Sequence, residues 1–394
     1  MPIYLDHAAT TPVRREVLEA MLPYLGEQFG NPSSAHSFGR SARAGLDEAH
    51  ERVAAGLGAD AREIVFTSGG TEANNLAIKG AAWAGKAVGH RIVATEVEHH
   101  AVGHVLRYLE KFGFETVEVP VDRYGRVDPD ELDAAINERT ILVSVMLANN
   151  EVGTIQPVRE IVERVRRHRG VLVHVDAVQA AAHVPIDVRA LNVDLLSIAA
   201  HKFEGPKGIG ALYVRHGTHL LGQHQGGEQE RHRRAGTENV AGAVGLASAY
   251  ELARAELPAT GRRLTKLRNR LRDAILAVPD TELTGHPVER LPGLLSIVAR
   301  GTDGTAVALS LDLEGIAVSV GSACTTGSTE PSHVLAAMGF PPDEARGALR
   351  MSLGRTTTEA EIETAIEAIP RTLAAMHAGE AAVVADPLGA AAIP

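Results

Sequence analysis

Short apolar runs alternate with amphipathic stretches between about residue 60 and residue 215. The runs are rich in β-branched residues and predict strands at 63–66, 91–94, 115–119, 141–145, 171–175, 194–198 and 210–214. The stretches between them repeat apolar residues at helical spacing, as in 71–84, 99–112 and 158–167. This alternation is typical of βαβ units. We therefore predict an α/β fold whose large domain has a mostly parallel seven-stranded sheet flanked by helices on both faces.

The pattern changes in the last third of the chain. A long helical tract from Asn239 to about Ala277 contains Pro258 and Gly261, and we expect it to break there at a hinge between domains. Beyond it, expected strands (294–298, 349–353) and helices (305–313, 331–338, 358–376) indicate a smaller α+β domain. The predicted division is 14–256 for the large domain and 1–13 with 257–376 for the small one. The Ala-, Gly- and Pro-rich segment 377–394 is expected to be a frayed tail.

Composition narrows the class of protein. At roughly 150 residues per domain, 394 residues correspond to more than one domain, and 45% hydrophobic with 22% charged residues is ordinary for a globular chain. A net charge of −10 repels phosphates, so we expect no direct nucleic-acid partner. We find no signal-peptide pattern and no apolar run of about 18 residues, so we expect a cytoplasmic protein without a membrane partner.

Metal and disulfide chemistry are also disfavoured by the sequence. The single cysteine, Cys324, excludes intramolecular disulfides and cysteine-based zinc sites. The histidines lack the spacing of a metal-binding motif, so we expect no metal site.

A small-residue turn offers a candidate anion site. The segment Thr67–Glu72 (Thr-Ser-Gly-Gly-Thr-Glu) follows an expected strand and opens an expected helix. Backbone N–H groups and the helix dipole would point there at a phosphate. The segment matches neither common nucleotide fingerprint, and a capping box with Thr71 as N-cap is an equally ordinary explanation.

Two further polar residues end expected strands. Asp176 ends one apolar run and Lys202 ends the next, so both belong at the strand ends where open α/β sheets bind ligands. Alone, the aspartate is an ordinary turn former and the lysine an ordinary surface charge. Together with the candidate anion site at Thr67–Glu72, they are the groups that pyridoxal 5'-phosphate needs. The carboxylate would pair with its pyridine nitrogen, the lysine would react with its aldehyde, and the anion site would bind its phosphate. His99 or His100 is placed to stack on its ring.

The chain resembles the cysteine desulfurase family, a branch of the class V aminotransferase-like pyridoxal phosphate enzymes of fold type I. The likeness runs from about residue 3 to about residue 370. The matching segments are 4–12, 29–34, 66–75, 148–157, 176–179, 201–203, 234–237, 321–325 and 330–334.

The resemblance implies roles around the cofactor ring. Lys202 resembles the Schiff-base lysine and Asp176 the partner of the pyridine nitrogen. Gln179 and Asn150 match the groups near the ring hydroxyl. His99 is similar to the stacking histidine, which also moves protons during the reaction.

Other matches concern the phosphate, the substrate and a second subunit. Gly70, Thr71 and His201 match phosphate-binding positions. Thr237 matches a threonine that reaches the phosphate of the neighbouring subunit, which implies a homodimer. Arg350 resembles the arginine that binds the substrate carboxylate, a task suited to a guanidinium.

Cys324 matches the family's nucleophile, although residue type alone favours a small buried hydrophobe. Its surroundings, Gly321–Ser328, are small, polar and bracketed by glycine, which favours an exposed loop. The implied reaction removes sulfur from L-cysteine, giving L-alanine and a persulfide on Cys324. A sulfur-acceptor protein would then receive the sulfur for iron–sulfur cluster, thio-nucleoside or other sulfur-compound biosynthesis.

Two positions depart from the family's pattern, and other activities stay open. Ala199 stands where many relatives have a phosphate-binding serine, and Glu228 where a third glycine usually follows Gly226 and Gly227. A selenocysteine lyase or another carbon–sulfur lyase on the same cofactor is the alternative enzyme. An ordinary aminotransferase is disfavoured because its chemistry does not require the cysteine loop. A non-catalytic scaffold or binding protein is disfavoured by the intact set Lys202, Asp176, His99 and Cys324.

Overall fold

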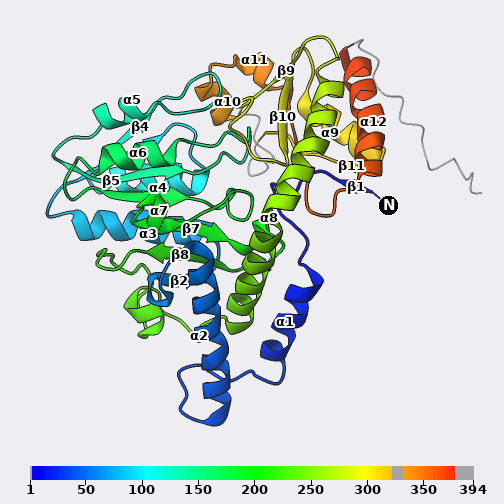
Figure 1. The fold of residues 1–394 in the computed structure, drawn as a ribbon. Coiled ribbons are helices and arrows are strands. Elements are labelled where there is room, and N and C mark those ends of the chain that lie inside the picture. The colour runs from blue at the N-terminus through cyan, green and yellow to red at the C-terminus, as the bar shows by residue number, and fades with distance from the viewer. Residues whose placement is uncertain (1, 322–331, 378–394) are drawn as a thin grey trace, which may run out of the picture.

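The computed structural model describes residues 2–321 and 332–377. Seven strands form its main sheet, and only β8 runs antiparallel to its neighbours. In spatial order the strands are β2 (Ile64–Thr67), β8 (Gly210–Val214), β7 (Leu195–Ala199), β6 (Leu172–Asp176), β5 (Thr140–Met146), β3 (Arg91–Thr95) and β4 (Glu115–Val119). The prediction of a mostly parallel seven-stranded sheet is confirmed, as Figure 1 shows on the left.

Helices cover both faces of the sheet because the strands are apolar on both faces. Successive residues of β2 point to opposite sides: Ile64 and Phe66 join one core and Val65 the other. One core includes α2 (Ser37–Leu57), α6 (Val158–Val165), α7 (Val188–Leu191) and the first part of α8. The other includes α3 (Gly70–Gly85) and α4 (His100–Glu110). The sequence predicted α3, α4 and α6 to within a few residues.

The expected break in the long helix is wrong. α8 runs without interruption from Val240 to Ile275, with Pro258 inside it (Figure 1). Its first part packs on α1 (Arg15–Leu25) and α2, and its second part joins a separate core through Leu264, Leu267 and Leu271. Burial of both ends stabilises one continuous helix and outweighs the unfavourable effect of the proline.

A smaller group of elements follows α8. β10 (Leu294–Ala299) lies between β12 (Ala348–Ser352) and β9 (Thr281–Leu283), and both pairings are antiparallel. β1 (Ile3–Tyr4) pairs with β11 (Ile316–Ala317), so the first residues of the chain lie against this part. Its helices are α9 (Gly304–Leu313), α10 (His333–Ala337), α11 (Pro342–Ala345) and α12 (Glu359–His377). The domain limits given above stay a prediction.

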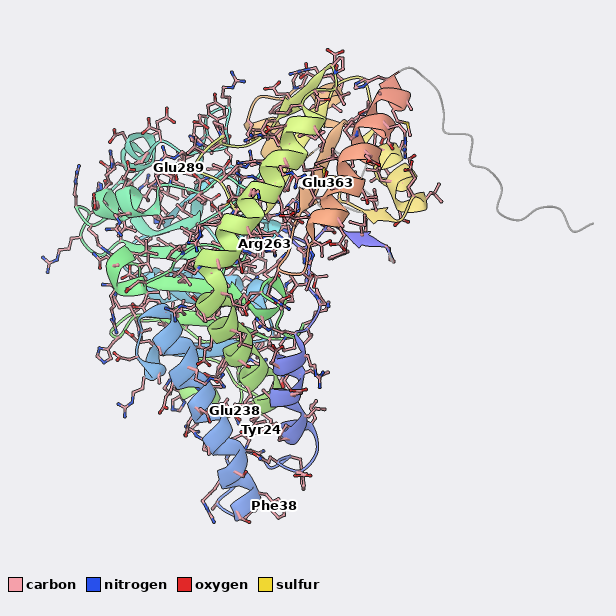
Figure 2. All side chains as sticks on the ribbon, turned by 45° about the vertical axis from the view of Figure 1, so that its right-hand side comes forward. Tyr24, Phe38, Glu238, Arg263, Glu289 and Glu363 are labelled. Atoms are coloured by element: carbon pink, nitrogen blue, oxygen red, sulfur yellow. The ribbon has the colours of Figure 1, made fainter. Side chains whose placement is uncertain are left out.

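α8 and α12 are joined on their exposed sides. Arg263 of α8 donates to the backbone oxygen of Thr357, and Glu363 of α12 pairs with Arg270 of α8 (Figure 2). The remaining elements are short: η1 (Ala61–Glu63), α5 (Pro129–Ala134), η2 (Ala200–Lys202) and η3 (Gln229–His232). None of the helices in the described ranges has the length and apolar character needed to cross a bilayer.

Candidate functional site

A cavity of about 400 Å³ opens at the carboxyl ends of the sheet strands. Nine of the residues expected from the sequence line it: Gly70, Thr71, His99, Asn150, Asp176, Gln179, His201, Lys202 and Arg350. The first eight come from segments at the carboxyl ends of the main-sheet strands, which the parallel arrangement brings to one edge. Arg350 comes from β12 in the three-stranded sheet. Ala8, Ala9, Asn74, Met146 and Ala199 complete much of the wall.

The first turn of α3 forms one end of the cavity. Gly69 is its N-cap and offers no side-chain hydrogen bond, so Thr71 does not act as the cap of a capping box. A Cβ atom on Gly70 would lie 2.6 Å from Val178 Cγ2, so any larger residue would require the Val178 side chain or the turn to shift. Helix N-termini carry N–H groups without an intrahelical partner and a partial positive charge. This end of the cavity thus favours an anion.

Asp176 ends β6 and is 5% exposed. Its Oδ2 accepts from Asn74 Nδ2 at 2.6 Å and its Oδ1 accepts from the Val178 backbone N–H at 2.9 Å. Burial raises the pKa of Asp176, and the two hydrogen bonds and the charge of Lys202 counteract part of that rise. A buried carboxylate held in this way favours a cationic partner, because a nearby positive charge offsets the cost of its desolvation.

Lys202 follows β7 and reaches across the cavity to the N-terminal segment. Its Nζ donates to the backbone oxygens of Ala8 and Ala9 at 2.5 and 3.0 Å. These contacts hold the amine at the cavity wall. The adjacent His201 is largely neutral at physiological pH, because burial and the charges of Lys202 and Lys207 lower its pKa to about 4.

His99 is the N-cap of α4, and its Nδ1 accepts from the Ala101 backbone N–H at 3.0 Å. An accepting Nδ1 carries no proton, so the proton of the neutral ring is on Nε2. Burial, followed by the charges of Lys202 and His100, lowers the pKa of His99 to about 4. A neutral imidazole at the wall of a cavity has a flat face for stacking and one nitrogen that can exchange a proton.

Arg350 lies on β12 of the three-stranded sheet and is 1% exposed. Its two Nη atoms donate at 2.9 Å to Asp6 Oδ1 and to the backbone oxygen of Asn150. Its Nε is buried and has no hydrogen-bond partner within residues 2–321 and 332–377. The guanidinium is thus held in place and retains a donor for a further anionic group.

The donor set fits pyridoxal 5'-phosphate. Three of its reactive parts need an anion site, a carboxylate and an amine, and the α3 N-terminus, Asp176 and Lys202 offer these on one cavity. Two buried atoms of the lining residues, Gln179 Oε1 and Asn74 Oδ1, have no hydrogen-bond partner among the described residues. A polar ligand would satisfy such atoms.

Two expected site residues are not among the described residues that line this cavity. Thr237 is exposed and does not line this cavity within the single chain. Cys324 lies outside the described residues, as does most of the segment 377–394. Among the described residues no group of three or more potential ligands is arranged to hold a metal.

The sequence did not single out Asn74, Asp6 or the carbonyls of Ala8 and Ala9. Asn74 is a buried amide in α3. The only sequence feature that could have pointed to it is an asparagine inside a predicted helix, where this residue type is unfavourable. Asp6, Ala8 and Ala9 belong to the segment 4–12, whose contact with the strand ends follows only from the fold.

Comparisons with known proteins agree with this site. The family model of class V aminotransferases matches residues 3–364. A cysteine desulfurase IscS of Methanosarcina thermophila is 51% identical over 93% of this chain and 91% of its own length. The solved structure of a NifS-like protein superposes with a TM-score of 0.90 at 39% identity, covering 95% of this chain and 99% of that one. A structure described as SspA in complex with cysteine gives 0.79 at 34% identity, covering 89% and 98%.

Proposed function

The chain belongs to the class V aminotransferase family and, within it, to the cysteine desulfurases, and we infer that it is a pyridoxal 5'-phosphate-dependent enzyme that removes sulfur from L-cysteine. The observation that carries this function is the convergence of Lys202, Asp176 and the α3 N-terminus on one cavity. The names of the relatives favour cysteine desulfuration over the selenocysteine lyase alternative.

We propose that the residues of the cavity hold the cofactor in the following way. Gly70, Thr71 and His201 bind its phosphate, and Asp176 pairs with its protonated ring nitrogen. Gln179 and Asn150 approach its ring hydroxyl. The bound cofactor supplies a covalent attachment for the substrate amine and withdraws electrons from the substrate Cα.

The chain's own groups then act on the substrate. Arg350 binds the carboxylate of L-cysteine through its guanidinium, which Asp6 and the Asn150 carbonyl already orient. Lys202 would hold the cofactor through its Nζ, and its amine, once free, would be able to take a proton at that atom. His99 stacks on the ring, and its Nε2 is the nitrogen from which a proton is given.

Cys324 is proposed as the nucleophile. Its thiolate bonds to the substrate sulfur as the Cβ–S bond of the substrate breaks, and the electron pair of that bond stays with the carbon skeleton. Protonation of the skeleton gives L-alanine, and the sulfur remains on Cys324 as a persulfide. A sulfur-acceptor protein removes it. We place the reaction in the cytoplasm, where a thiol stays reduced.

We also propose a homodimer in which Thr237 reaches the cofactor phosphate of the partner subunit. Its support is the match of segment 234–237 to the family motif and the exposure of Thr237 away from its own cavity. Glu228, nearby in sequence, is exposed and is proposed to face the same interface.

The purified protein and its Cys324→Ser variant are incubated with L-cysteine while alanine and sulfide are followed. We expect alanine only from the wild type, and peptide mass spectrometry should find one additional sulfur atom on Cys324. Equal alanine formation by the variant would contradict the role of the thiol and favour a lyase reaction.

A further inference from the structure

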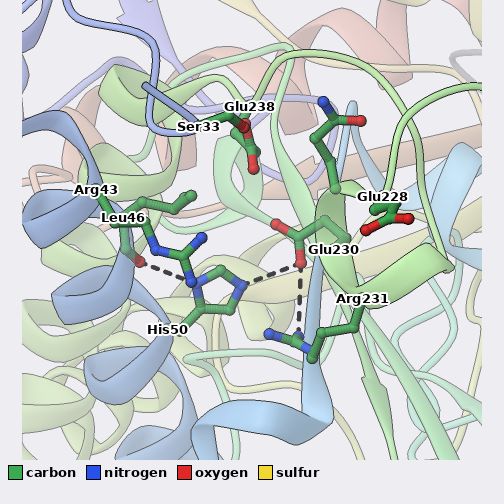
Figure 3. Close-up of a pocket in the computed structure, with 9 residues that line it drawn as sticks. Ser33, Arg43, Leu46, His50, Glu228, Glu230, Arg231 and Glu238 are labelled. Carbon is green, nitrogen blue, oxygen red and sulfur yellow. Dashed lines mark hydrogen bonds and ion pairs between the residues drawn. The ribbon is translucent and has the colours of Figure 1, made fainter. Parts of the chain in front are cut away.

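A second, polar cavity lies between α2 and the segment 228–238 (Figure 3). Its volume is about 210 Å³. Charged groups from both elements line it: Arg43, His50, Glu228, Glu230, Arg231 and Glu238. Two of these are buried, His50 at 6% exposure and Glu230 at 7%. The proposed reaction uses neither of them.

The contacts of His50 join α2 to the segment 228–238. Its Nδ1 is 2.9 Å from the backbone oxygen of Leu46, and its Nε2 is 3.0 Å from Glu230 Oε2 (Figure 3). Arg231 Nη2 lies 3.6 Å from the same carboxylate oxygen. The buried carboxylate of Glu230 is thus held from two sides, by a residue of α2 and by its own neighbour in the chain.

The carboxylate of Glu230 belongs to a strained turn. Glu230, Arg231 and His232 have φ angles of 47°, 57° and 63°, in the left-handed region that favours glycine. Each costs roughly 1 kcal/mol for an ordinary residue. Such a conformation persists only where surrounding contacts determine it. His50 holds the first of these residues, and Arg231 donates to the backbone oxygen of Ile64 in β2.

Two series of contacts lead from His50 to the backbone of Ser68–Gly70 at the start of α3, which we call the phosphate cradle. Beyond the strained turn, Arg234 Nε donates to Glu72 Oε1 at 2.9 Å. Glu72 Oε2 in turn accepts from the Ser68 backbone N–H at 2.7 Å, directly before Gly69 and Gly70.

The second route is shorter. The His50 ring packs on Phe66 with their centroids 4.5 Å apart, and Phe66 lies two residues before Ser68.

In the first route, burial would raise the pKa of Glu72, but the hydrogen bonds from Arg234 and Ser68 lower it. Glu72 therefore remains a charged link between the turn and the cradle.

We propose that the buried His50–Glu230 pair is a positioning element for the cofactor phosphate. It fixes the turn 230–232 and strand β2, and through Arg234, Glu72 and Phe66 it fixes the backbone at Ser68–Gly70. The same turn sets the course of the chain toward Thr237. This inference rests on the proposed function, because it assumes that the cradle binds the phosphate of pyridoxal 5'-phosphate. His50 itself lines only the second cavity.

The test measures cofactor affinity and fold stability separately. Apoprotein of the wild type, His50→Gln, Glu230→Gln and His50→Arg is titrated with pyridoxal 5'-phosphate, and thermal unfolding of each apoprotein is recorded. We expect the Kd to rise about tenfold in both Gln variants, within the usual range of coupling between linked sites. His50→Arg keeps a permanently charged donor and should restore most of the affinity.

His168→Gln is the matched control. His168 Nε2 also pairs with a carboxylate, that of Asp133 at 2.7 Å, but away from both cavities. We expect this variant to keep the wild-type Kd. Equal rises of Kd in His168→Gln and His50→Gln would overturn the proposal, because the effect would be general destabilisation. Folded Gln variants with wild-type Kd would overturn it as well.

A spectroscopic measurement does not depend on the variants folding. In NMR spectra of the wild type, the His50 ring should show contacts to the Phe66 ring, and their absence would overturn the proposal. A wild-type protein that takes up no pyridoxal 5'-phosphate would refute the proposed function and remove the inference with it. Normal uptake of the cofactor by both the wild type and the Gln variants would instead overturn only the role of His50 and Glu230 and leave the proposed function standing.

Discussion

Asn74 provides a direct test of how the cavity controls the charge of Asp176. Its Nδ2 donates to Asp176 Oδ2 at 2.6 Å, in a buried setting. Asn74→Leu removes this donor with little change in volume. A hydrogen bond to a charged group contributes about 1.5–3 kcal/mol, which corresponds to about 10- to 100-fold in an equilibrium constant.

Most of this loss should be seen as weaker cofactor binding. Without the Asn74 hydrogen bond, the ionised form of the buried Asp176 side chain is less stable, and protonation in the apoprotein removes that cost. Cofactor binding needs the ionised form, because only a carboxylate pairs with a positively charged ring nitrogen. Burial already raises the pKa of Asp176, and loss of the Asn74 hydrogen bond raises it further. On acidification the neutral carboxyl loses its attraction for the ring nitrogen. The acid side of the Kd–pH curve should therefore move to higher pH in the variant.

The assay is titration of apoprotein with pyridoxal 5'-phosphate across a pH series. Asn75→Leu is the control, because Asn75 Nδ2 donates only to the Thr71 backbone oxygen and does not line the cavity. Thermal unfolding of the two apoproteins shows whether the fold is preserved. A Kd for Asn74→Leu equal to that of Asn75→Leu at every pH would refute the reasoning.

Three further changes test other parts of the cavity. Gly70→Ala places a Cβ atom 2.6 Å from Val178 Cγ2 and should raise the Kd for the cofactor at least tenfold by fluorescence titration; an unchanged Kd would place the phosphate elsewhere. Ala199→Ser adds a hydroxyl beside Gly70 and should tighten binding about fivefold, as one net hydrogen bond of about 1 kcal/mol predicts. For His99, whose pKa burial lowers to about 4, an NMR titration of the apoprotein should give a midpoint near that value and not near 6.5.

The sequence was sufficient for the sheet and for most of the cavity. Strand pattern and strand-end polar residues placed Asp176 and Lys202 at one edge, because side chains that end neighbouring parallel strands must lie close together. The segments carrying Gly70, His99 and Asn150 follow β2, β3 and β5 in the same way. For Gly70, His99, Asp176 and Lys202, local pattern and this general rule of topology were enough. Asn150 and His201 were predicted from the family resemblance.

Other features depend on contacts that no local pattern reveals. The continuity of α8 through Pro258 follows from burial at both of its ends, and the short strands β9 and β11 form through pairing with β10 and β1. The partners Asp6 and Asn74 were missed for the same reason. Residues far apart in sequence meet their carboxylate or guanidinium only after folding.

The central claim is that Lys202 bonds to the cofactor. Protein loaded with pyridoxal 5'-phosphate is reduced with borohydride, digested and sequenced by mass spectrometry. We predict a pyridoxyl group on the Nζ of Lys202, and none in the Lys202→Ala variant treated in the same way. A pyridoxyl group on Lys207 alone, or on no lysine, would contradict the account.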